Sequence, residues 1–283
     1  MSELVCHNAA PPKMSRSTFS KFSLFIQEEL GIKMPGMKLV MLQSRLSKRL
    51  KKTNCSSFDK YYEYVFSPEG RKNELFNMID VVTTNKTDFF REANHFNYLT
   101  TKALPELTAL KKKVGLWSAG CSTGEEPYTL AMVLKDYSDS KTPKLNFSIL
   151  ATDISCRVLD KAMLGEYTTD QIEPVPLALR KKYMLRGQKN KEGYVKIKSF
   201  LKSYIKFKRL NLLDANYGFK TCMDIIFCRN VIIYFDKSTQ KQVITQFCRS
   251  LNHEGYLFLG HSETLNDHEL PLHQVAPTVY KKY

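Results

Sequence analysis

Beyond about residue 114, short apolar segments alternate with longer amphipathic ones, and this alternation limits the possible folds more than any other feature of the chain. The apolar segments have the length of strands and the amphipathic ones have the spacing of helices, which is typical of βαβ units with parallel strands. The segments predicted as strands are VGLWSAG, NFSILATD, YIKFKRLNLL, MDIIFCRN, YLFLGHSE and TVYKKY. The pattern predicts an α/β domain with a doubly wound, mostly parallel sheet that carries helices on both faces.

The part of the chain before residue 83 has helical spacing only. Phe19, Phe22 and Ile26 recur on one helical face, and a leucine stripe from Leu39 to Leu50 has basic residues beside it. The segment DFFREANHFNYLTTKALPEL, which follows this region, reads as one amphipathic helix. We predict three parts: a disordered lead over residues 1–17, an N-terminal helical domain over 18–82 and the α/β domain over 83–283.

Residues 180–209 interrupt the alternation with twelve basic residues and a single acid, Glu192. Within them, YVKIK at 194–198 alternates with a period of two, as a half-exposed strand does. Gly187 and Gly193 flank a polar turn. We expect a small antiparallel β insertion, at about residues 184–208, with one strongly basic face.

The chain carries a net charge of +15 at pH 7, which favours an anionic partner without distinguishing nucleic acid, a membrane surface or an acidic protein. No apolar run approaches the ~20 residues of a membrane-spanning helix, and the N-terminus lacks the pattern of a secretory signal. The seven cysteines contain no CxxC pair, which fits a reducing cytoplasm, and the six histidines form no ligand pair. We therefore expect a cytoplasmic protein without a metal.

The segment SAGCSTGEEPY contains the end of a strand, a glycine-bearing turn and the start of a helix. Glycine at such a turn lets a ligand approach the backbone closely. A helix that begins there can bind pyrophosphate, but Glu125 and Glu126 would repel a phosphate, and the spacing is not G-x-G-x-x-G. The turn therefore disfavours NAD and favours a ligand with a positive centre, such as S-adenosylmethionine with its sulfonium and amino groups.

Two other predicted strands end in polar side chains. Asp153 ends NFSILATD, where a carboxylate can accept hydrogen bonds from both hydroxyls of a ribose. Arg229 and Asn230 follow the strand MDIIFC, and Tyr234 comes a few residues later. Because ligands bind at the carboxyl edge of open α/β sheets, we expect these side chains beside the glycine turn, with Asn230 and Tyr234 facing the reacting centre.

The order of these motifs resembles that of the CheR family of chemotaxis-receptor methyltransferases over nearly the whole chain. The matching segments are TTNKTDFFRE at 83–92, STGEEPY at 122–128, ATDIS at 151–155, NLL at 211–213, FCRNVIIYFD at 227–236 and LGHSE at 259–263. The resemblance implies a Rossmann-like doubly wound methyltransferase sheet behind a helical domain. It also implies S-adenosylmethionine as methyl donor, S-adenosylhomocysteine as product, and methyl esterification of glutamate side chains on methyl-accepting chemotaxis receptors, which tunes adaptation.

The resemblance further implies which residues contact the cofactor: Asn85, Thr87, Arg91, Ala119, Glu126, Asp153, Asn211, Leu212, Arg229 and Asn230. The first three would hold its methionine end, Glu126 its amino group and Asp153 its ribose. Asn211 and Leu212 would flank the adenine. Arg91, Asn230 and Tyr234 are the residues expected at the transferred methyl group, where Arg91 would orient the substrate carboxylate and Tyr234 would donate a hydrogen bond to it.

Receptor glutamates lie on helices among other acids, so the resemblance and the charge together predict basic contact surfaces. One is the helix face that carries Arg45, Lys48, Arg49 and Lys52. The other is the insertion at Arg186, Gly187 and Gly193, which resembles the β-subdomain with which some family members grip a C-terminal receptor peptide. A glutamate carboxylate, with a pKa of ~4.3, is an anion at pH 7, so the reaction needs no general base.

Two other functions remain open on the sequence. A nucleic-acid methyltransferase would also explain the charge, but Asn230 does not precede a Pro-Pro-aromatic pattern and no base-stacking motif is present, so we expect no nucleic-acid partner. A non-catalytic, cofactor-binding signalling module would keep the fold without turnover, but every candidate catalytic position is filled as in the family pattern. Contact with a membrane is expected only through the receptor.

Overall fold

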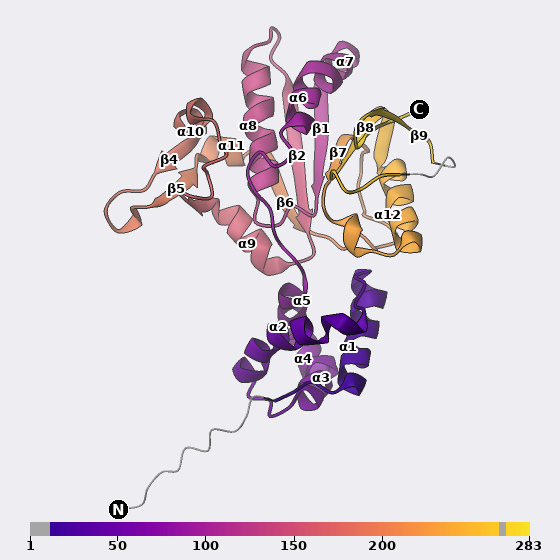
Figure 1. Cartoon of the computed structure of the whole chain (residues 1–283). Coiled ribbons are helices and arrows are strands. Elements are labelled where there is room, and N and C mark those ends of the chain that lie inside the picture. Colours follow the sequence, from indigo (N-terminus) through magenta and orange to yellow (C-terminus); the bar gives the residue numbers. More distant parts are fainter. Residues whose placement is uncertain (1–11, 266–269) are drawn as a thin grey trace, which may run out of the picture. The chain divides into compact units, whose positions relative to one another are not determined.

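The computed structural model describes residues 12–265 and 270–283. The chain divides into two compact units, and the boundary falls between Thr83 and Thr84 (Figure 1). The first unit is helical, and the second contains both sheets. Among the described residues, no helix combines the length and apolar character that crossing a bilayer requires.

The helical unit begins earlier than the sequence pattern predicts. Ser15 caps α1 by accepting a hydrogen bond from the Thr18 N–H, and Met14 ahead of this cap is buried. The lead expected to be disordered over residues 1–17 is therefore ordered at its C-terminal end, and residues 1–11 lie outside the described part. The helices are α1 (Arg16–Leu30), η1 (Gly36–Lys38), α2 (Leu39–Lys52), α3 (Phe58–Phe66), α4 (Pro68–Asn73) and α5 (Leu75–Val82).

The core of the helical unit combines apolar side chains with one buried acid. Phe22 and Leu46 are fully buried, as the predicted helical stripes require. Glu74, only 3% exposed, accepts hydrogen bonds from the guanidinium of Arg49 and from the hydroxyl of Tyr61. A buried carboxylate is tolerated when it is paired in this way, so Arg49 has a structural partner inside the unit.

A seven-stranded sheet with the order β6-β2-β1-β7-β8-β10-β9 forms the centre of the larger unit (Figure 1). The strands from β6 to β8 are parallel, and β10 runs antiparallel to both of its neighbours. This confirms the predicted doubly wound α/β architecture, to which the unpredicted strand β9 adds an antiparallel edge. The strands are β1 (Lys113–Ala119), β2 (Asn146–Asp153), β6 (Ile205–Arg209), β7 (Met223–Cys228), β8 (Leu251–Leu259), β9 (Leu272–Ala276) and β10 (Val279–Lys282).

Helices between the strands pack against this sheet. α8 and α9 contact β2 and β6, α7 contacts β1, and α12 contacts β8. The side chain of Ser155 caps α9, and Gly165 ends it with a left-handed φ of 57°. The helices are α6 (Asn94–Tyr98), the π-helical turn η2 (Leu99–Ala103), α7 (Leu104–Leu110), α8 (Glu125–Asp139), α9 (Cys156–Leu164), α10 (Leu177–Tyr183), η3 (Lys189–Lys191), α11 (Ser199–Lys202), η4 (Ile232–Tyr234) and α12 (Lys237–Ser250).

The segment DFFREANHFNYLTTKALPEL is not one helix, so this prediction was wrong. Phe90 and Glu92 have φ of 54° and 55°, and such values interrupt a right-handed helix before α6 begins. Pro105 has no N–H to donate to the preceding turn, and the chain passes through η2 just before it. Next to these two unusual φ values, the side chain of Glu92 lies at the carboxyl edge of the sheet. There it accepts hydrogen bonds from Asn230 and from the N–H of His261.

The basic insertion forms a three-stranded antiparallel sheet with the order β3-β5-β4. Its strands are β3 (Glu166–Thr168), β4 (Met184–Arg186) and β5 (Tyr194–Ile197). β5 alternates between exposed and buried residues, which confirms its predicted period of two. The range of 184–208 needs correction, because β3 belongs to this sheet and β6 pairs instead with β2 of the large sheet. β6 is an edge strand with lysines on its exposed side, so its sequence resembles that of the insertion.

The winding of the large sheet reverses between β1 and β7. From β1 the chain proceeds to β2 and β6 on one side, whereas β7 and β8 lie on the other side. At such a reversal, the loops leaving the two central strands diverge and open a crevice at their carboxyl ends. The predicted site residues that follow β1, β2 and β7 all belong to this edge.

Candidate functional site

The turn from β1 to α8 closely approaches the loop after β7. Gly120 and Gly124 have φ of 83° and 98°, which glycine adopts without strain. The N–H of Gly120 donates to the Thr152 carbonyl of β2 over 2.8 Å. A Cβ on Gly120 would lie 2.5 Å from Cγ2 of Val231. Glycine at this position therefore lets the ends of β1, β2 and β7 converge.

Asp153, the last residue of β2, lies at this edge with 8% of its surface exposed. Its Oδ2 accepts the Ser122 N–H at 2.8 Å, and its Oδ1 accepts the Ser155 N–H at 3.0 Å. These hydrogen bonds fix the carboxylate in one orientation and stabilise its charged form. Each oxygen keeps acceptor capacity for a further donor, such as a ribose hydroxyl.

The residues predicted around a base lie next to Asp153. The N–H of Leu210 donates to the Asp153 carbonyl over 3.0 Å, which brings the following residues to the end of β2. Asn211 accepts the Leu213 N–H at 3.1 Å, and Leu212 is buried. Ala119, at the end of β1, is also buried. The residues predicted to flank a base thus follow directly on the backbone contact with Asp153.

Glu126 is in the first turn of α8 and is buried. Its Oε1 accepts the Ser118 hydroxyl at 2.6 Å, and its Oε2 accepts Nε of Arg229 at 2.8 Å. The negative charge of Glu126 is thus already paired inside the protein. A cationic ligand could be accommodated only by the remaining lone pairs of this carboxylate.

Arg229 extends from the end of β7 into the protein, and its side chain is 2% exposed. Beyond its bond to Glu126, its Nη1 donates to the Arg91 carbonyl at 2.7 Å and lies 3.5 Å from Oε2 of Glu92. Phe96 is stacked near the guanidinium, 5.1 Å from ring centroid to Cζ. Because this guanidinium is directed to protein groups, Arg229 is better described as joining α8, β7 and the segment before α6 than as a direct ligand contact.

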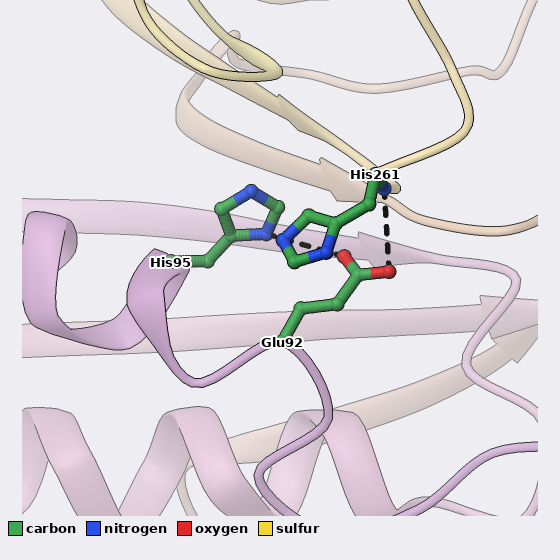
Figure 2. Close-up of side chains that lie close together, drawn as sticks. All are labelled: Glu92, His95 and His261. Atoms are coloured by element: carbon green, nitrogen blue, oxygen red, sulfur yellow. Dashed lines mark hydrogen bonds and ion pairs between the residues drawn. The ribbon is translucent and has the colours of Figure 1, made fainter.

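Figure 2 shows Glu92 with His95 and His261, which come from the segment before α6, from α6 itself and from the loop after β8. One possible ligand atom of each lies within 4.8 Å of the others, an arrangement that can bind a transition metal. However, Nη1 of Arg229 lies 3.4 Å from Nδ1 of His95 and 3.5 Å from Oε2 of Glu92. A fixed guanidinium so close would repel a divalent cation, so we assign this cluster to the Arg229 network and propose no metal.

The imidazole of His95 is buried, and its Nε2 lies 3.0 Å from the Thr278 hydroxyl. Burial and the positive charge of Arg229 lower the pKa of His95 to about 4, against the opposing effect of Glu92. The ring is therefore neutral at pH 7 and can accept a hydrogen bond from the guanidinium.

Asn230 has a left-handed φ of 60°, which is uncommon for a residue other than glycine. Its Nδ2 donates to Oε1 of Glu92 at 3.4 Å. Its Oδ1 is buried and has no hydrogen-bond partner among the residues that the structure describes. Leaving a buried acceptor unpaired costs about 1–3 kcal/mol, so Oδ1 is suited to receive a donor from a bound ligand.

Residues 85–92, which precede α6, also lie at the carboxyl edge of the large sheet. The carbonyl of Asn85 accepts the Ser122 hydroxyl at 2.8 Å, which holds this segment against the glycine turn. Thr87 is partly buried, and Nη1 of Arg91 donates to the Lys86 carbonyl at 3.3 Å. Tyr234, in η4 after β7, is also partly exposed. The backbone thus gathers the predicted methionine-end and methyl-group residues around one edge.

Glu125 is a buried acid at this edge for which the sequence suggested no role beyond the helix terminus. Burial, with a smaller contribution from Asp88, raises its pKa to about 7, while a hydrogen bond from Thr123 opposes the shift. The Thr123 hydroxyl donates to its Oε2 at 2.7 Å. Its charge therefore varies near neutral pH, whereas Glu126 is paired with Arg229.

Two of the four cations predicted on the helix α2 have partners within their own unit. Arg49 is paired with buried Glu74, and Arg45 donates to the Val82 and Thr83 carbonyls. Lys48 and Lys52 are exposed. The predicted basic face is therefore smaller than the sequence suggests, because leucine-stripe spacing does not reveal which flanking cations are used inside the bundle.

The predicted contact residues of the insertion lie at its tip. Arg186 is exposed at the end of β4, Gly193 has a φ of 83°, and a Cβ on Gly187 would lie 2.0 Å from the Lys191 carbonyl. Lys191 and Lys196 are paired with Glu166 of β3, at 2.9 and 3.0 Å. These pairs neutralise part of the basic face.

Several residues that organise the site were not selected from the sequence as site residues. Glu92 and Glu263 stand in the quoted segments TTNKTDFFRE and LGHSE, so the motifs contained the signal without indicating a role. Ser118 and Ser122 also stand in a quoted segment, SAGCSTGEEPY, without an indicated role, whereas His95 lies outside the quoted family segments and has its partners on other elements. Together the edge presents the acceptors of Asp153, Glu126 and Asn230, which suit a ligand with hydroxyl groups and positive charge.

Comparison with protein families gives two matches that together cover nearly all of the chain. Residues 85–281 match the model of the CheR methyltransferase, SAM binding domain. Residues 17–83 match that of the CheR methyltransferase, all-alpha domain. The boundary between the two matches agrees with that between the two units of the structure.

Similar proteins come from several bacteria. A chemotaxis protein methyltransferase from Borreliella burgdorferi is 38% identical over 95% of this chain and 95% of its own length. Chemotaxis protein methyltransferase 2 from Pseudomonas aeruginosa is 35% identical over 94% of this chain and 93% of its own. A chemotaxis protein methyltransferase from Escherichia coli is 35% identical over 94% of this chain and 91% of its own. The similarity thus extends over both units.

Proposed function

The chain belongs to the CheR family of methyltransferases, and we propose that it forms methyl esters on glutamate side chains of methyl-accepting chemotaxis receptors. Its larger unit is an S-adenosylmethionine-binding domain. The relatives' name, chemotaxis protein methyltransferase, supports a chemotaxis receptor as the substrate. The observation that carries the proposal is the convergence of Asp153, Glu126 and Asn230 at one edge of the sheet.

The residues at this edge fit the cofactor chemically. When bound, S-adenosylmethionine supplies an activated methyl group on a sulfonium. The Asp153 carboxylate is oriented by two backbone N–H groups and can accept the ribose hydroxyls. Oδ1 of Asn230, which has no hydrogen-bond partner in the described parts of the chain, can accept a further donor, and Glu126 contributes negative charge at the same edge of the sheet. Asn211 and Leu212 would flank the base.

The chain need not remove a proton for this reaction. A glutamate side chain has a pKa of ~4.3, so at pH 7 it is already a nucleophilic carboxylate. Its oxygen forms the new bond to the methyl carbon as the bond to sulfur breaks, and opposite charges are neutralised. The protein therefore has to position the reactants and exclude water. We assign the orientation of the carboxylate to Arg91, with a hydrogen bond from Tyr234.

We further propose that the protein works in the cytoplasm and reaches its substrate on the cytoplasmic helices of a membrane-embedded receptor. The net charge of +15 favours encounter with an acidic helix. Lys48 and Lys52 on α2, and Arg186 on the insertion, are exposed cations that could steer this encounter. The tip of the insertion, with Gly187 and Gly193, is the part that could grip a C-terminal receptor peptide.

The test is transfer of labelled methyl groups from S-adenosylmethionine to receptor-containing membranes, followed by mild alkali. Label released as methanol identifies carboxyl methyl esters and supports the proposal. Alkali-stable label, or label on nucleic acid, would contradict it. The Asp153→Asn protein is the control, because we expect the substitution to weaken the cofactor site more than the fold. Cofactor binding without transfer to any receptor would instead indicate a non-catalytic module.

A further inference from the structure

Glu263 follows β8 and is 3% exposed, and the hydrogen bonds of its side chain are to backbone N–H groups. Its carboxylate accepts four backbone N–H groups. Oε2 accepts those of Gly260 and Asn230 at 2.7 and 2.9 Å, and Oε1 accepts those of Val231 and Ile233 at 2.9 and 3.2 Å. One side chain thus joins the loop after β8 to the loop after β7.

The loop held by this carboxylate is the one that carries Asn230 and Tyr234. Three of its N–H groups donate to Glu263, and two of them belong to the start of η4, where N–H groups have no partner within the helix. Asn230 is held at a φ of 60° in this arrangement. Such a conformation persists only when the surrounding contacts compensate for its strain. Glu263 supplies such contacts at Asn230 itself and at two residues that follow it.

Gly260, in the loop after β8, packs closely against the loop that carries Asn230. A Cβ at this position would lie 2.7 Å from Nδ2 of Asn230, 2.8 Å from its backbone nitrogen and 2.9 Å from Oε2 of Glu263. The two loops are therefore packed as closely as a glycine allows. Nδ2 of Asn230 then reaches Glu92, and its Oδ1 is left without a hydrogen-bond partner among the described residues.

The charge of Glu263 has no cationic partner among the described residues, unlike that of Glu126. Burial raises its pKa, and the four N–H groups oppose this rise. Replacing such an acceptor with a neutral amide leaves at least one N–H facing an NH2 group. The loop of residues 229–234 is then no longer held by four hydrogen bonds to one anion.

We propose that Glu263 is a positioning residue for methyl transfer, which holds the loop of residues 229–234 in the one conformation that aims Asn230 and Tyr234 at the reacting groups. This inference rests on the proposed function for its catalytic consequence, but the anchoring itself can be tested separately. Glu263 acts through the loop and is not assigned a contact with cofactor or receptor.

The experiment compares the wild type with Glu263→Gln in two measurements. Amide hydrogen exchange, measured without receptor, should become at least tenfold faster at Gly260, Asn230, Val231 and Ile233, and unchanged in β1 and β2. The rate of a single turnover at saturating S-adenosylmethionine and receptor should fall at least tenfold, while KM for the receptor stays within twofold. Glu254→Gln, which alters a partly exposed glutamate paired with Lys281, is the matched control and should change neither.

Gly260→Ala gives a second route to the same result if Glu263→Gln folds poorly, because its Cβ would displace Asn230 and Oε2 of Glu263 while the carboxylate itself is retained. It should reproduce the loss of turnover. Unchanged exchange at the four amides would overturn the anchoring. Faster exchange with an unchanged saturating rate would overturn the positioning role. If the wild type itself methylates no receptor, the proposed function fails, and the exchange measurement still decides on the anchor.

Discussion

Nε of Arg229 and Oε2 of Glu126 lie 2.8 Å apart and join the end of β7 to the first turn of α8, with side chains that are 2% and 10% exposed. The same guanidinium reaches the Arg91 carbonyl and lies near Glu92 and His95. A buried charge of this kind is stable only while its partners remain. The ion pair therefore stabilises the fold of the domain and also holds together the elements at the carboxyl edge of the sheet.

Arg229→Met tests this connection. The substitution leaves Glu126 and Glu92 buried without their cation, so we expect the free energy of unfolding to fall by about 3–5 kcal/mol. Urea unfolding, followed by circular dichroism, measures the change. The control is Lys182→Met, whose ion pair with Asp136 is exposed and should contribute at most about 1 kcal/mol. Similar small losses in both variants would show that the buried network does not stabilise the fold.

Asp153→Asn should weaken cofactor binding more than it weakens the fold. The amide loses one acceptor and presents an NH2 group to the N–H of Ser122 or Ser155, and it can no longer accept fully from ribose hydroxyls. A hydrogen bond to a charged group contributes about 1.5–3 kcal/mol, so affinity should fall about 10- to 150-fold. Titration calorimetry with S-adenosylhomocysteine measures it. Asp160→Asn, on the exposed side of α9, should bind as the wild type does.

The general fold and the strand ends of the site could be predicted from sequence, because both depend on local pattern. The alternation of apolar segments fixes the βαβ order, and Asp153 occupies the expected end of β2. The side-chain network was not predictable in this way. Arg229 meets Glu126 and Arg91, which are more than one hundred residues away, and no local spacing encodes these contacts. The segment predicted as one helix is interrupted at Phe90 and Glu92, on either side of Arg91, whose carbonyl accepts from Arg229.

The pairing of basic residues in the insertion and on α2 was also not predictable from the sequence. A run of basic residues predicts an exposed basic surface, but the sequence does not show which cations are paired. Glu166 of β3 forms ion pairs with Lys191 and Lys196, although it lies outside the range of 184–208 predicted for the insertion. Glu74 is hydrogen-bonded to Arg49 inside the helical unit. Because edge strands also alternate polar and apolar residues, β6 could not be distinguished from the insertion by its period alone.

Gly120→Ala should destabilise the protein by two separable effects. The φ of 83° disfavours any side chain, and the new Cβ would lie 2.5 Å from Cγ2 of Val231. We expect a loss of about 2–4 kcal/mol in the free energy of unfolding, from left-handed strain and overpacking together. Adding Val231→Ala should recover only the overpacking part. Gly115→Ala is the control, because its nearest contact is 3.8 Å away and its φ is ordinary; equal losses at both glycines would contradict this reasoning.

The buried, neutral His95 should make stability depend on pH. Its pKa is about 4 in the folded protein, lowered by burial and by Arg229, against ~6.5 in the unfolded chain. Between these values the unfolded state binds one more proton, so stability falls as pH decreases from about 6.5 to 4 and is fully present above that window. The difference in the free energy of unfolding is on the order of 3 kcal/mol. Glu92 and His261 face the same ring, so the comparison must isolate His95 itself.

His95→Gln provides that comparison. Glutamine can still bond to Thr278 but does not titrate, so the variant should lose the part of the pH dependence that His95 contributes. Urea unfolding of both proteins at pH 7.5, 6.5, 5.5 and 4.5 gives the free energy of unfolding at each pH. The two proteins are then compared by how steeply this free energy changes with pH. If wild type and variant lose stability in parallel over this range, the neutral state of His95 is not responsible for it.

Salt dependence should distinguish the unpaired cations of the insertion from the paired ones. Arg186 and Lys189 are exposed and have no ion-pair partner in the described parts of the chain, whereas Lys191 and Lys196 share Glu166. Charges that steer an acidic partner act over about 8 Å at physiological ionic strength and mainly change the association rate. Replacing Arg186 and Lys189 with glutamate should therefore lower kcat/KM for receptor methylation about 3- to 10-fold at low salt, with kcat unchanged.

The difference between this variant and the wild type should shrink as salt is raised, because screening weakens attraction and repulsion alike. Lys144→Glu with Lys220→Glu, two exposed lysines outside the insertion, supplies a variant with the same net charge. If that control loses kcat/KM equally, the total charge steers the receptor and the insertion has no special part. If neither variant responds to salt, electrostatic steering is excluded and the basic face must act through contacts formed after encounter.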